Sequence, residues 1–164
     1  MGYRVAVITC SDRAFAEVYE DRSGPVLRDG LAEAGFEVAP AAIVPDEADQ
    51  ILQAVTAAIA EGARIVMTTG GTGVGPRDVT VEATASIVEY ELPGLMEEIR
   101  RTGAVKTPLA LLSRGVAGVI ALPGAERALL VNAPGSRGGA RDTLAVVGPL
   151  LTHIVEQLDG ADHV

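Results

Sequence analysis

The sequence predicts an α/β fold with three layers, in which a mostly parallel sheet is flanked by helices on both faces. Short apolar, β-branched segments alternate along the chain with segments whose apolar residues recur at helical spacing. Parallel strands need crossover connections, which are usually helices, so this alternation favours a parallel sheet. The 164 residues suffice for one buried core but not for two full ones. We therefore expect residues 1–164 to form a single domain.

The first half of the chain begins this alternation. Residues 4–9 form a short apolar run, which we expect to be a buried strand. A helix should follow, with Ser23 as its N-cap and Pro25 just inside, and it should end at Gly35. A second strand is expected at residues 36–44. The apolar face of the next helix consists of Ile51, Leu52, Val55 and Ile59.

The second half of the chain is less regular. A third buried strand at residues 63–67 runs into a glycine-rich loop, and helices are expected after it at about residues 81–89 and 93–101. Two further strands, at residues 116–121 and 128–132, are expected to form a hairpin-like excursion.

The last part of the chain is helical in pattern, from about residue 138 to residue 158. Pro149 lies inside this stretch. Proline removes a backbone donor and clashes with the preceding turn of a helix. We therefore expect Pro149 either to kink one helix or to divide the stretch into two.

The most informative segment is the glycine-rich loop at residues 68–80, which reads T-T-G-G-T-G-V-G-P-R-D-V-T. Glycine adopts positive φ readily and lacks a Cβ, so backbone N–H groups in such a loop can turn toward phosphate oxygens. Thr80 is expected to cap a helix that begins near Val81, whose N-terminus adds a partial positive charge. With the carboxylate of Asp78, this pattern indicates a site for a phosphorylated ligand and a metal ion. The alternative is a plain flexible turn.

Two well-known phosphate loops do not match this segment. Gly70 and Gly75 stand at the Walker spacing, but Pro76 and Arg77 occupy the places where lysine and serine or threonine are required. The glycines also alternate one by one, which is not the G-x-G-x-x-G spacing of dinucleotide-binding proteins. The loop is therefore neither a P-loop nor a dinucleotide fingerprint.

The loop and several shorter motifs closely resemble the MogA/MoaB family of molybdenum cofactor biosynthesis, the molybdopterin adenylyltransferases. The strongest features are T-T-G-G-T-G at residues 68–73 and D-V-T at residues 78–80. The shorter matches are Ser11-Asp12-Arg13, Pro45-Asp46-Glu47, Ser113-Arg114 and Pro134-Gly135-Ser136. They follow in order along nearly the full chain. The resemblance implies the molybdopterin-binding fold, a trimer or a hexamer built from two trimers, and a molybdate-insertion protein as a further partner.

We expect the chemistry at one rim of the sheet, because ligands of parallel α/β sheets gather beyond the carboxyl ends of the strands. Four segments that are distant in sequence should reach this rim: residues 11–13, Asp46, residues 70–78 and residues 134–136. Unrelated structural turns would not explain this coincidence well.

The resemblance gives Asp46 and Asp78 a catalytic and metal-binding role. From sequence alone, an alternative is that Asp46 caps the following helix, with Asp49 completing a capping box. The same alternative is weaker for Asp78, because Thr80 is available as the cap of the next helix. The residues expected to bind substrate or phosphate are Ser11, Asp12, Thr69, Gly70, Gly71, Thr72, Gly73, Ser113, Arg114, Pro134, Gly135 and Ser136.

The reaction that the resemblance implies is attack by the terminal phosphate of molybdopterin on the α-phosphate of ATP, giving adenylyl-molybdopterin and pyrophosphate. Mg²⁺ held by Asp46 and Asp78 would neutralise the charge that gathers there. A phosphate monoester has a second pKa near ~6, so no general base is needed. Three alternatives stay open: a MoaB-like protein that binds molybdopterin or a nucleotide without efficient catalysis, metal insertion, which resembles larger multidomain proteins, and an unrelated phosphate-binding regulator.

Composition limits the partners of this chain. A formal net charge of −9 and a pI of about 4.6 oppose attraction to nucleic acid and to anionic membranes. The longest apolar run, near residues 115–125, is far below the ~18 residues of a membrane span. Phosphates must therefore be bound locally, by backbone amides, a cation and a few arginines. The arginines in or beside loops are Arg77, Arg114, Arg137 and Arg141, and Arg137 takes the place of a common proline of the family.

Cys10 is the only cysteine, which excludes a disulfide within the chain. No group of histidines and cysteines has the spacing of a zinc site. Both observations fit a reducing, cytoplasmic location. Cys10 follows the first strand, and we expect it to be a small buried hydrophobic residue and not a nucleophile.

Overall fold

The computed structural model describes residues 2–162, and its centre is a sheet of seven strands in the order β2-β1-β4-β7-β6-β5, with β3 also paired to β1. Strands β1, β2, β3, β4 and β7 run parallel, whereas β6 is antiparallel to both β7 and β5. The predicted α/β class with a mostly parallel sheet is therefore confirmed. The strands are β1 (Arg4–Cys10), β2 (Glu37–Val38), β3 (Ala42–Val44), β4 (Ile65–Thr69), β5 (Val88–Glu91), β6 (Ala117–Ile120) and β7 (Ala128–Ala133).

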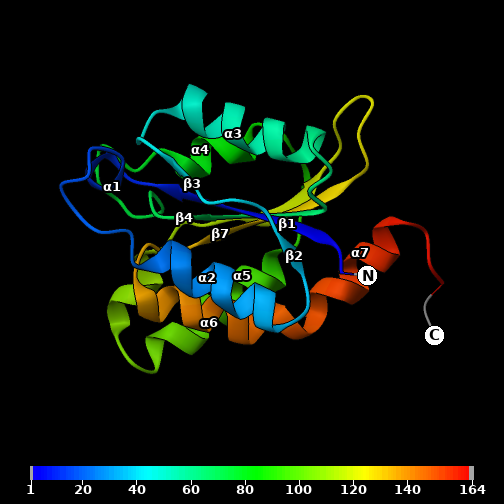
Figure 1. The fold of residues 1–164 in the computed structure, drawn as a ribbon. Coiled ribbons are helices and arrows are strands. Elements are labelled where there is room, and N and C mark those ends of the chain that lie inside the picture. Colours follow the sequence, from blue (N-terminus) through cyan, green and yellow to red (C-terminus); the bar gives the residue numbers. More distant parts are fainter. Residues whose placement is uncertain (1, 163–164) are drawn as a thin grey trace.

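Helices cover both faces of the sheet, which gives the predicted three layers. In Figure 1, α3 and α4 lie above the sheet, while α2, α5 and α6 lie below it. The α-helices are α1 (Asp12–Phe15), α2 (Ser23–Glu33), α3 (Ala48–Ala60), α4 (Thr80–Ala85), α5 (Pro93–Ala104), α6 (Arg137–Val147) and α7 (Leu151–Leu158). Two 3₁₀ helices, η1 (Pro108–Leu112) and η2 (Gly148–Leu150), complete the described chain.

The core is divided by the sheet into two apolar clusters, as the two-residue period of β1 requires. Val5 and Val7 point into the cluster that contains Leu27 of α2, while Ala6 and Ile8 point into the other. On that second face, the predicted apolar side of α3 is buried through Ile51, Val55 and Ile59. A fully buried aliphatic side chain contributes about 1.5–3 kcal/mol, so both helical layers are fixed mainly by these contacts.

Two expected elements differ in the structure. Residues 36–44 are divided into β2 and β3, which pair with opposite ends of β1. Pro40 lies between them, and a proline has no N–H to continue the ladder. The helix expected at residues 81–89 is wrong in its second half, because α4 ends at Ala85 and β5 begins at Val88.

The cause of the second difference lies across the sheet. β5 is an antiparallel edge strand that pairs with β6, and valine and tyrosine favour such a position. Its paired residues in β6 lie 27 to 32 positions further along the chain, so no local sequence pattern indicates this strand. The hairpin of β6 and β7 is confirmed, and η2 divides α6 from α7 around Pro149, as expected.

The carboxyl ends of the parallel strands all face the same end of the sheet, where α1 lies in Figure 1. The described chain begins and ends at the opposite end of the molecule (Figure 1). None of the helices within residues 2–162 combines the length and the apolar character needed to cross a bilayer. The single-domain organisation of residues 1–164 stays a prediction.

Candidate functional site

The glycine loop, residues 70–78, leaves the carboxyl end of β4 through two residues that only glycine can occupy comfortably. Gly70 and Gly71 have φ values of 95° and 67°. A Cβ on Gly70 would overlap the carbonyl oxygen of Cys10, and a Cβ on Gly71 would overlap Oγ1 of Thr80. Both the backbone conformation and the close packing therefore require glycine here. Such a specific conformation argues against the alternative of a plain flexible turn.

Asp46 is held by a reciprocal contact with Asp12 of the neighbouring loop. The backbone N–H of Asp46 donates to Oδ1 of Asp12, and the N–H of Asp12 donates to Oδ2 of Asp46, both at 2.9 Å. The N-cap of α3 is Glu47, with no side-chain hydrogen bond, so the alternative in which Asp46 caps this helix is wrong. Oδ1 of Asp46 lies beside Gly71, where a Cβ would come within 3.3 Å of it.

Asp78 closes the glycine loop from its far end. Its Oδ2 accepts a hydrogen bond from the N–H of Gly75 at 2.9 Å, and a Cβ on Gly73 would also lie 2.9 Å from this oxygen. Thr80 does not cap the next helix, since it is the first residue of α4 and the N-cap is Val79. The hydroxyl of Thr80 is buried and has no hydrogen-bond partner among the described residues. Asp78 therefore has a structural contact that the sequence did not reveal.

Two of the loop arginines, Arg77 and Arg114, are held by ion pairs and hydrogen bonds with residues around the site. Arg77 pairs with Asp12 at 3.0 Å and with Glu47 at 3.2 Å. Arg114 donates to the carbonyl oxygens of Gly73 at 2.7 Å and Asp78 at 3.1 Å, and it forms an ion pair with Glu82. These contacts give Arg114 a positioning role on the glycine loop. Its predicted contact with substrate stays a prediction.

The electrostatics of the two neighbouring aspartates differ. Burial raises the pKa of the Asp46 carboxyl, the charges of Asp12 and Asp78 raise it further, and the hydrogen bond from the N–H of Asp12 opposes the rise. The guanidinium of Arg77 and the N–H of Asp46 lower the pKa of Asp12. Asp46 is thus the carboxylate whose charged form is the least well compensated, and a cation beside it would stabilise that form.

Two hollows flank the glycine loop. The polar hollow, of about 370 Å³, is bordered by Cys10, Tyr19, Asp46 and the loop before α2. The apolar hollow, of about 600 Å³, is bordered by η1 and the start of α6. The two hollows share Gly70, Gly71, Asp78, Gly135 and Ser136.

Most of the predicted site residues border one or both hollows. Ser11, Thr69 and Asp46 border the polar hollow, while Thr72, Gly73, Ser113 and Pro134 border the apolar one. Asp12 and Arg114 border neither, and they act on the residues that do.

The hydroxyl groups among these residues are engaged in fixing the loops. Ser11 caps α1 by accepting from the N–H of Ala14 at 3.1 Å, and Ser136 caps α6 by accepting from the N–H of Gly139 at 3.0 Å. Thr69 donates to the carbonyl oxygen of Pro134 at 2.9 Å and lies 2.9 Å from the hydroxyl of Ser23. Ser113 lies 3.3 Å from the hydroxyl of Thr72.

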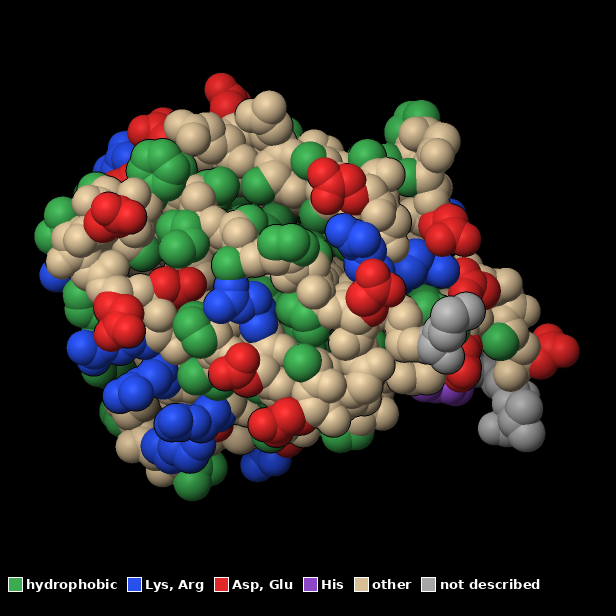
Figure 2. Space-filling view, in the orientation of Figure 1, with side chains coloured by type: hydrophobic (Ala, Val, Ile, Leu, Met, Phe, Trp, Pro, Cys, Tyr) green, Lys and Arg blue, Asp and Glu red, His purple; other side chains and the backbone are tan. Residues whose placement is uncertain are grey.

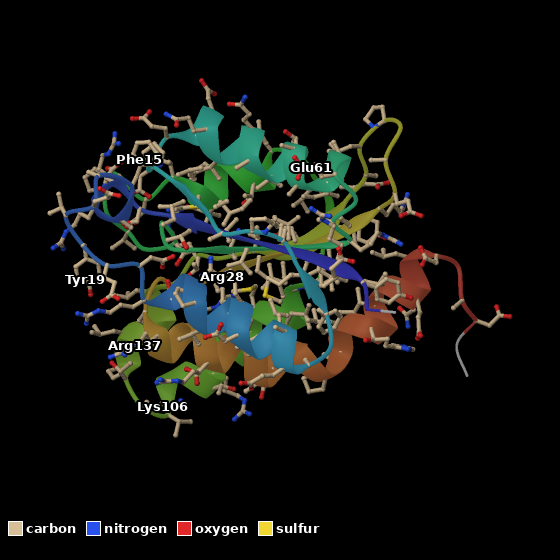
Figure 3. The ribbon with its side chains drawn as sticks, in the orientation of Figure 1. Phe15, Tyr19, Arg28, Glu61, Lys106 and Arg137 are labelled. Carbon is tan, nitrogen blue, oxygen red and sulfur yellow. The ribbon has the colours of Figure 1, made fainter. Side chains whose placement is uncertain are left out.

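The loop before α2, residues 16–22, contributes to the polar hollow, although the sequence did not predict it as part of the site. Its Tyr19, Asp21 and Arg22 border the polar hollow. Ser23 was expected to cap α2, but it is the first residue of that helix, and the N-cap is Arg22, whose side chain makes no capping hydrogen bond. Asp21 lies one residue before the N-cap, and its Oδ1 accepts from the N–H of Gly24 in the first turn at 3.0 Å. The position of Tyr19, at 4.8 Å from the Arg13 guanidinium and 5.2 Å from that of Arg22, has no signal in the sequence (Figure 3).

The aspartates of the polar hollow fit a magnesium ion that the substrate completes. Within residues 2–162, no three side chains of His, Cys, Asp or Glu come together to hold a metal. Mg²⁺ is commonly bound by one or two carboxylates together with substrate phosphates and water. Asp46 and Asp78 both border the polar hollow. Oδ2 of Asp46 accepts from the N–H of Asp12 and Oδ2 of Asp78 accepts from the N–H of Gly75, while within residues 2–162 Oδ1 of each accepts no hydrogen bond. Such a pair suits a cation that arrives with phosphate.

Comparisons with known proteins find relatives over nearly the whole chain. Residues 6–153 match the family described as the probable molybdopterin binding domain. The molybdopterin adenylyltransferase of Helicobacter pylori is 35% identical over 161 residues, which are 95% of this chain and 88% of that protein. The molybdenum cofactor biosynthesis bifunctional protein of Synechococcus elongatus is 40% identical over 162 residues, or 99% of this chain. The chain spans only 49% of that bifunctional relative.

Solved structures show the same fold. The molybdopterin biosynthesis enzyme MoaB of Thermus thermophilus superposes with a TM-score of 0.86 at 42% identity, covering 97% of this chain and 98% of MoaB. A structure of MogA superposes with a TM-score of 0.87 at 39% identity, covering 94% of this chain and 99% of MogA. The resemblance to MogA and MoaB proteins that the sequence motifs indicated is thus confirmed, and this chain belongs to the family of the probable molybdopterin binding domain.

Proposed function

We propose that this chain transfers the adenylyl group of Mg-ATP to molybdopterin, giving adenylyl-molybdopterin and pyrophosphate. The observation that carries the proposal is the convergence of Asp46 and Asp78, from two distant loops, on a hollow that the glycine loop borders. The relatives named molybdopterin adenylyltransferase, including that of Helicobacter pylori, support it.

The two hollows suit the two substrates in different ways. The polar hollow carries the aspartates and lies against Gly70 and Gly71, so it suits the phosphates of ATP. The apolar hollow, bordered by Leu109 and Leu112, suits the fused rings of the pterin. The glycine loop between them would bring the terminal phosphate of molybdopterin to the α-phosphorus of ATP.

In the proposed reaction a phosphate oxygen of molybdopterin forms a new bond to the α-phosphorus of ATP. The bond from that phosphorus to the bridging oxygen breaks, and pyrophosphate leaves with the electron pair. The attacking phosphate is already largely dianionic at neutral pH, since its second pKa is near ~6. Among residues 2–162, no histidine borders either hollow, and none is needed as a base.

The residues of this chain then act by position and charge. Asp46 and Asp78 would hold Mg²⁺, which when bound offsets the negative charge of the reacting phosphates. Arg77 keeps Asp12 paired, so that Asp12 holds the Asp46 loop in place. Arg114 donates to the carbonyl groups of Gly73 and Asp78, which would hold the N–H groups of the glycine loop in position for the phosphates.

The direct test is incubation of the chain with molybdopterin, ATP and Mg²⁺, followed by chromatography for the adenylylated pterin and for pyrophosphate. We expect both products in equal amounts. A double variant, Asp46→Asn with Asp78→Asn, is the negative control. Binding of molybdopterin without either product would move the chain to the alternative of a binding protein that does not catalyse efficiently.

A trimer, or a hexamer of two trimers, is part of the proposal. Val105 and Leu111, which do not border the apolar hollow, are 81% and 62% exposed, and this supports contact with another subunit. Light scattering coupled to size exclusion should give three or six times the mass of the chain, and a monomer mass at micromolar concentration would contradict it. We also propose a cytoplasmic location and transfer of the product to a molybdate-insertion protein. The buried thiol of Cys10, 2% exposed, supports the location.

A further inference from the structure

A third hollow adjoins the polar hollow on the side away from the glycine loop. It has a volume of about 450 Å³ and lies between the loop before α2 and the first turns of α6. Three arginines border it, Arg22, Arg137 and Arg141, and we call it the arginine hollow. It shares Arg22 and Arg137 with the polar hollow, so the two are continuous. In Figure 2 a group of basic side chains covers the lower left of the molecule, and Figure 3 places Arg137 there.

The arginines of this hollow lack a carboxylate partner among the described residues, whereas seven of the 13 basic residues of the chain have one. Within residues 2–162, no ion pair or hydrogen bond is recorded for the guanidinium of Arg22, Arg137 or Arg141. The basic residues that do face a carboxylate are Arg4, Arg64, Arg77, Arg101, Lys106, Arg114 and Arg127. In a protein with a net charge of −9, unpaired positive charge gathered at one hollow is a feature that a ligand would explain.

The acidic residues at this hollow do not cancel the charge. Asp21 is turned to other partners, since its Oδ1 accepts from the N–H of Gly24 at 3.0 Å and its Oδ2 accepts from the hydroxyl of Thr9 at 2.8 Å. Glu20 is exposed and is the other carboxylate there. Three guanidinium groups thus stand against two carboxylates, beside the N-terminus of α6, whose partial charge is also positive. The hollow as a whole favours an anion.

The place of the hollow indicates which anion. No residue borders both the arginine hollow and the apolar hollow, and each meets the polar hollow through different residues. In phosphoryl and nucleotidyl transfer the attacking and leaving oxygens lie roughly in line on opposite sides of phosphorus. If the pterin approaches from the apolar hollow, the leaving group departs on the other side, toward Arg22 and Arg137.

We infer that the arginine hollow binds the β- and γ-phosphates of the nucleoside triphosphate, and the pyrophosphate that they become after transfer. The inference rests on the proposed adenylyl transfer for its place in the reaction. Arginine binds phosphate oxygens through two parallel N–H donors, and Arg137 and Arg141 are four residues apart on one face of α6. The hollow therefore distinguishes a nucleoside triphosphate from a monophosphate, and it carries the charge of the leaving group away from the aspartates.

The test is calorimetric titration of the full chain with three probes in Mg²⁺ buffer: ATP, AMP and inorganic pyrophosphate. In the double variant Arg137→Gln with Arg141→Gln, we expect the affinities for ATP and pyrophosphate to fall by about 10-fold to 100-fold, as for the loss of charged hydrogen bonds. The affinity for AMP should change by less than about 2-fold, because its single phosphate lies in the polar hollow. The double variant Arg101→Gln with Arg127→Gln makes the same change in net charge away from the site and should leave all three affinities unchanged.

Kinetics separate this inference from the proposed function. If adenylyl-molybdopterin forms and the arginine variant keeps the KM for ATP and the inhibition by pyrophosphate of the original chain, the inference is wrong while adenylyl transfer stands. If the variant loses pyrophosphate binding but the original chain forms no adenylylated pterin, the anion site is upheld and the proposed function fails. An equal loss of affinity for AMP and ATP would also overturn the inference, because the arginines would then act on the whole molecule. Thermal unfolding of each variant shows whether the fold is retained.

Discussion

The polar and apolar hollows share one backbone loop but are built from different kinds of side chain. On the polar side, Asp46 is a carboxylate whose charged form is poorly compensated. On the apolar side, Leu109 and Leu112 provide the wall, and apart from the shared Asp78 the ionised groups that border it, Lys106 and Asp142, form an ion pair at 2.6 Å. One side of the loop is therefore arranged to handle charge and the other to match shape. A substitution in the glycine loop should therefore affect ligand binding in both hollows, whereas a substitution in the wall of one hollow should affect binding in that hollow only.

Gly71→Val should have the largest effect, because it alters the backbone that the two hollows share. The new side chain would overlap Thr80 and would have to occupy a φ of 67°, which costs about 1 kcal/mol or more for the conformation alone. We expect binding of both ATP and the pterin to be lost, as measured by calorimetry, while the chain stays folded. Gly94→Val is the matched control, since a Cβ on Gly94 meets no atom within 4 Å. Unchanged affinities in the Gly71 variant would mean that the loop is only a turn.

Asp78→Asn should have the next largest effect and should act on the reaction more than on binding. Asparagine can still accept the hydrogen bond from the N–H of Gly75, so the loop should stay closed. Loss of the negative charge should lower the rate of adenylyl transfer by at least ~10²-fold, about 2.7 kcal/mol, with Tm little changed. Single-turnover kinetics with saturating substrates measure this directly. An unaltered rate would remove Asp78 from the metal site.

Asp46→Asn should reduce adenylyl transfer by ~10-fold or more and should leave Tm unchanged or raise it at neutral pH. Because burial and neighbouring charges raise the pKa of Asp46, its ionised form destabilises the folded chain above that pKa. This destabilisation disappears as the pH falls and Asp46 becomes protonated. The Tm of the variant should thus exceed that of the original chain most at neutral pH, and the difference should vanish in acid. Calorimetric scans across pH would contradict this account if the difference grew toward low pH.

Leu112→Asp should have the smallest effect and should separate the two hollows most clearly. Leu112 borders the apolar hollow and is 52% exposed, so a carboxylate there should raise the KM for the pterin by about 5-fold, or roughly 1 kcal/mol, and leave the KM for ATP unchanged. Leu150→Asp is the control, since Leu150 is 42% exposed on η2 and does not border the hollow. Equal increases in both KM values would show that the two hollows act as one site.

The sequence predicted the parts of the fold and site that depend on local chemistry. β1, β4 and β7 are short, apolar and buried, and the glycines of the loop between residues 70 and 75 carry their own conformational preference. The same holds for Cys10, which is 2% exposed, and whose thiol pKa is raised to about 12 by burial. It lies in the wall of the polar hollow as a small apolar group and not as an ionised nucleophile.

The parts that the sequence could not predict depend on partners far along the chain. Asp46 matches a helix cap locally, but its partner is Asp12, 34 residues earlier. The family motif predicts that Arg114 binds substrate. In the structure, the guanidinium of Arg114 instead donates to Gly73 and Asp78 of the glycine loop and pairs with Glu82 of α4. The local sequence decides neither the role of Asp46 nor that of Arg114, because the contacts that they make exist only after the sheet has brought distant loops together. The arginine hollow has the same origin, since α2 and α6 meet only through packing.

The position of the chain ends has a consequence for larger proteins built from this unit. The described chain starts and finishes at one end of the sheet (Figure 1), and the residues that border the polar and apolar hollows follow the carboxyl ends of β1, β4 and β7 at the other end. Arg64 fastens the finishing end there, by binding Asp159 at 2.5 Å and the carbonyl oxygen of Arg127 at 3.0 Å. A further domain joined at either end would therefore sit behind the sheet and leave the two hollows accessible. The bifunctional protein of Synechococcus elongatus, of which this chain spans 49%, is a longer chain in which such an arrangement would keep the site unobstructed.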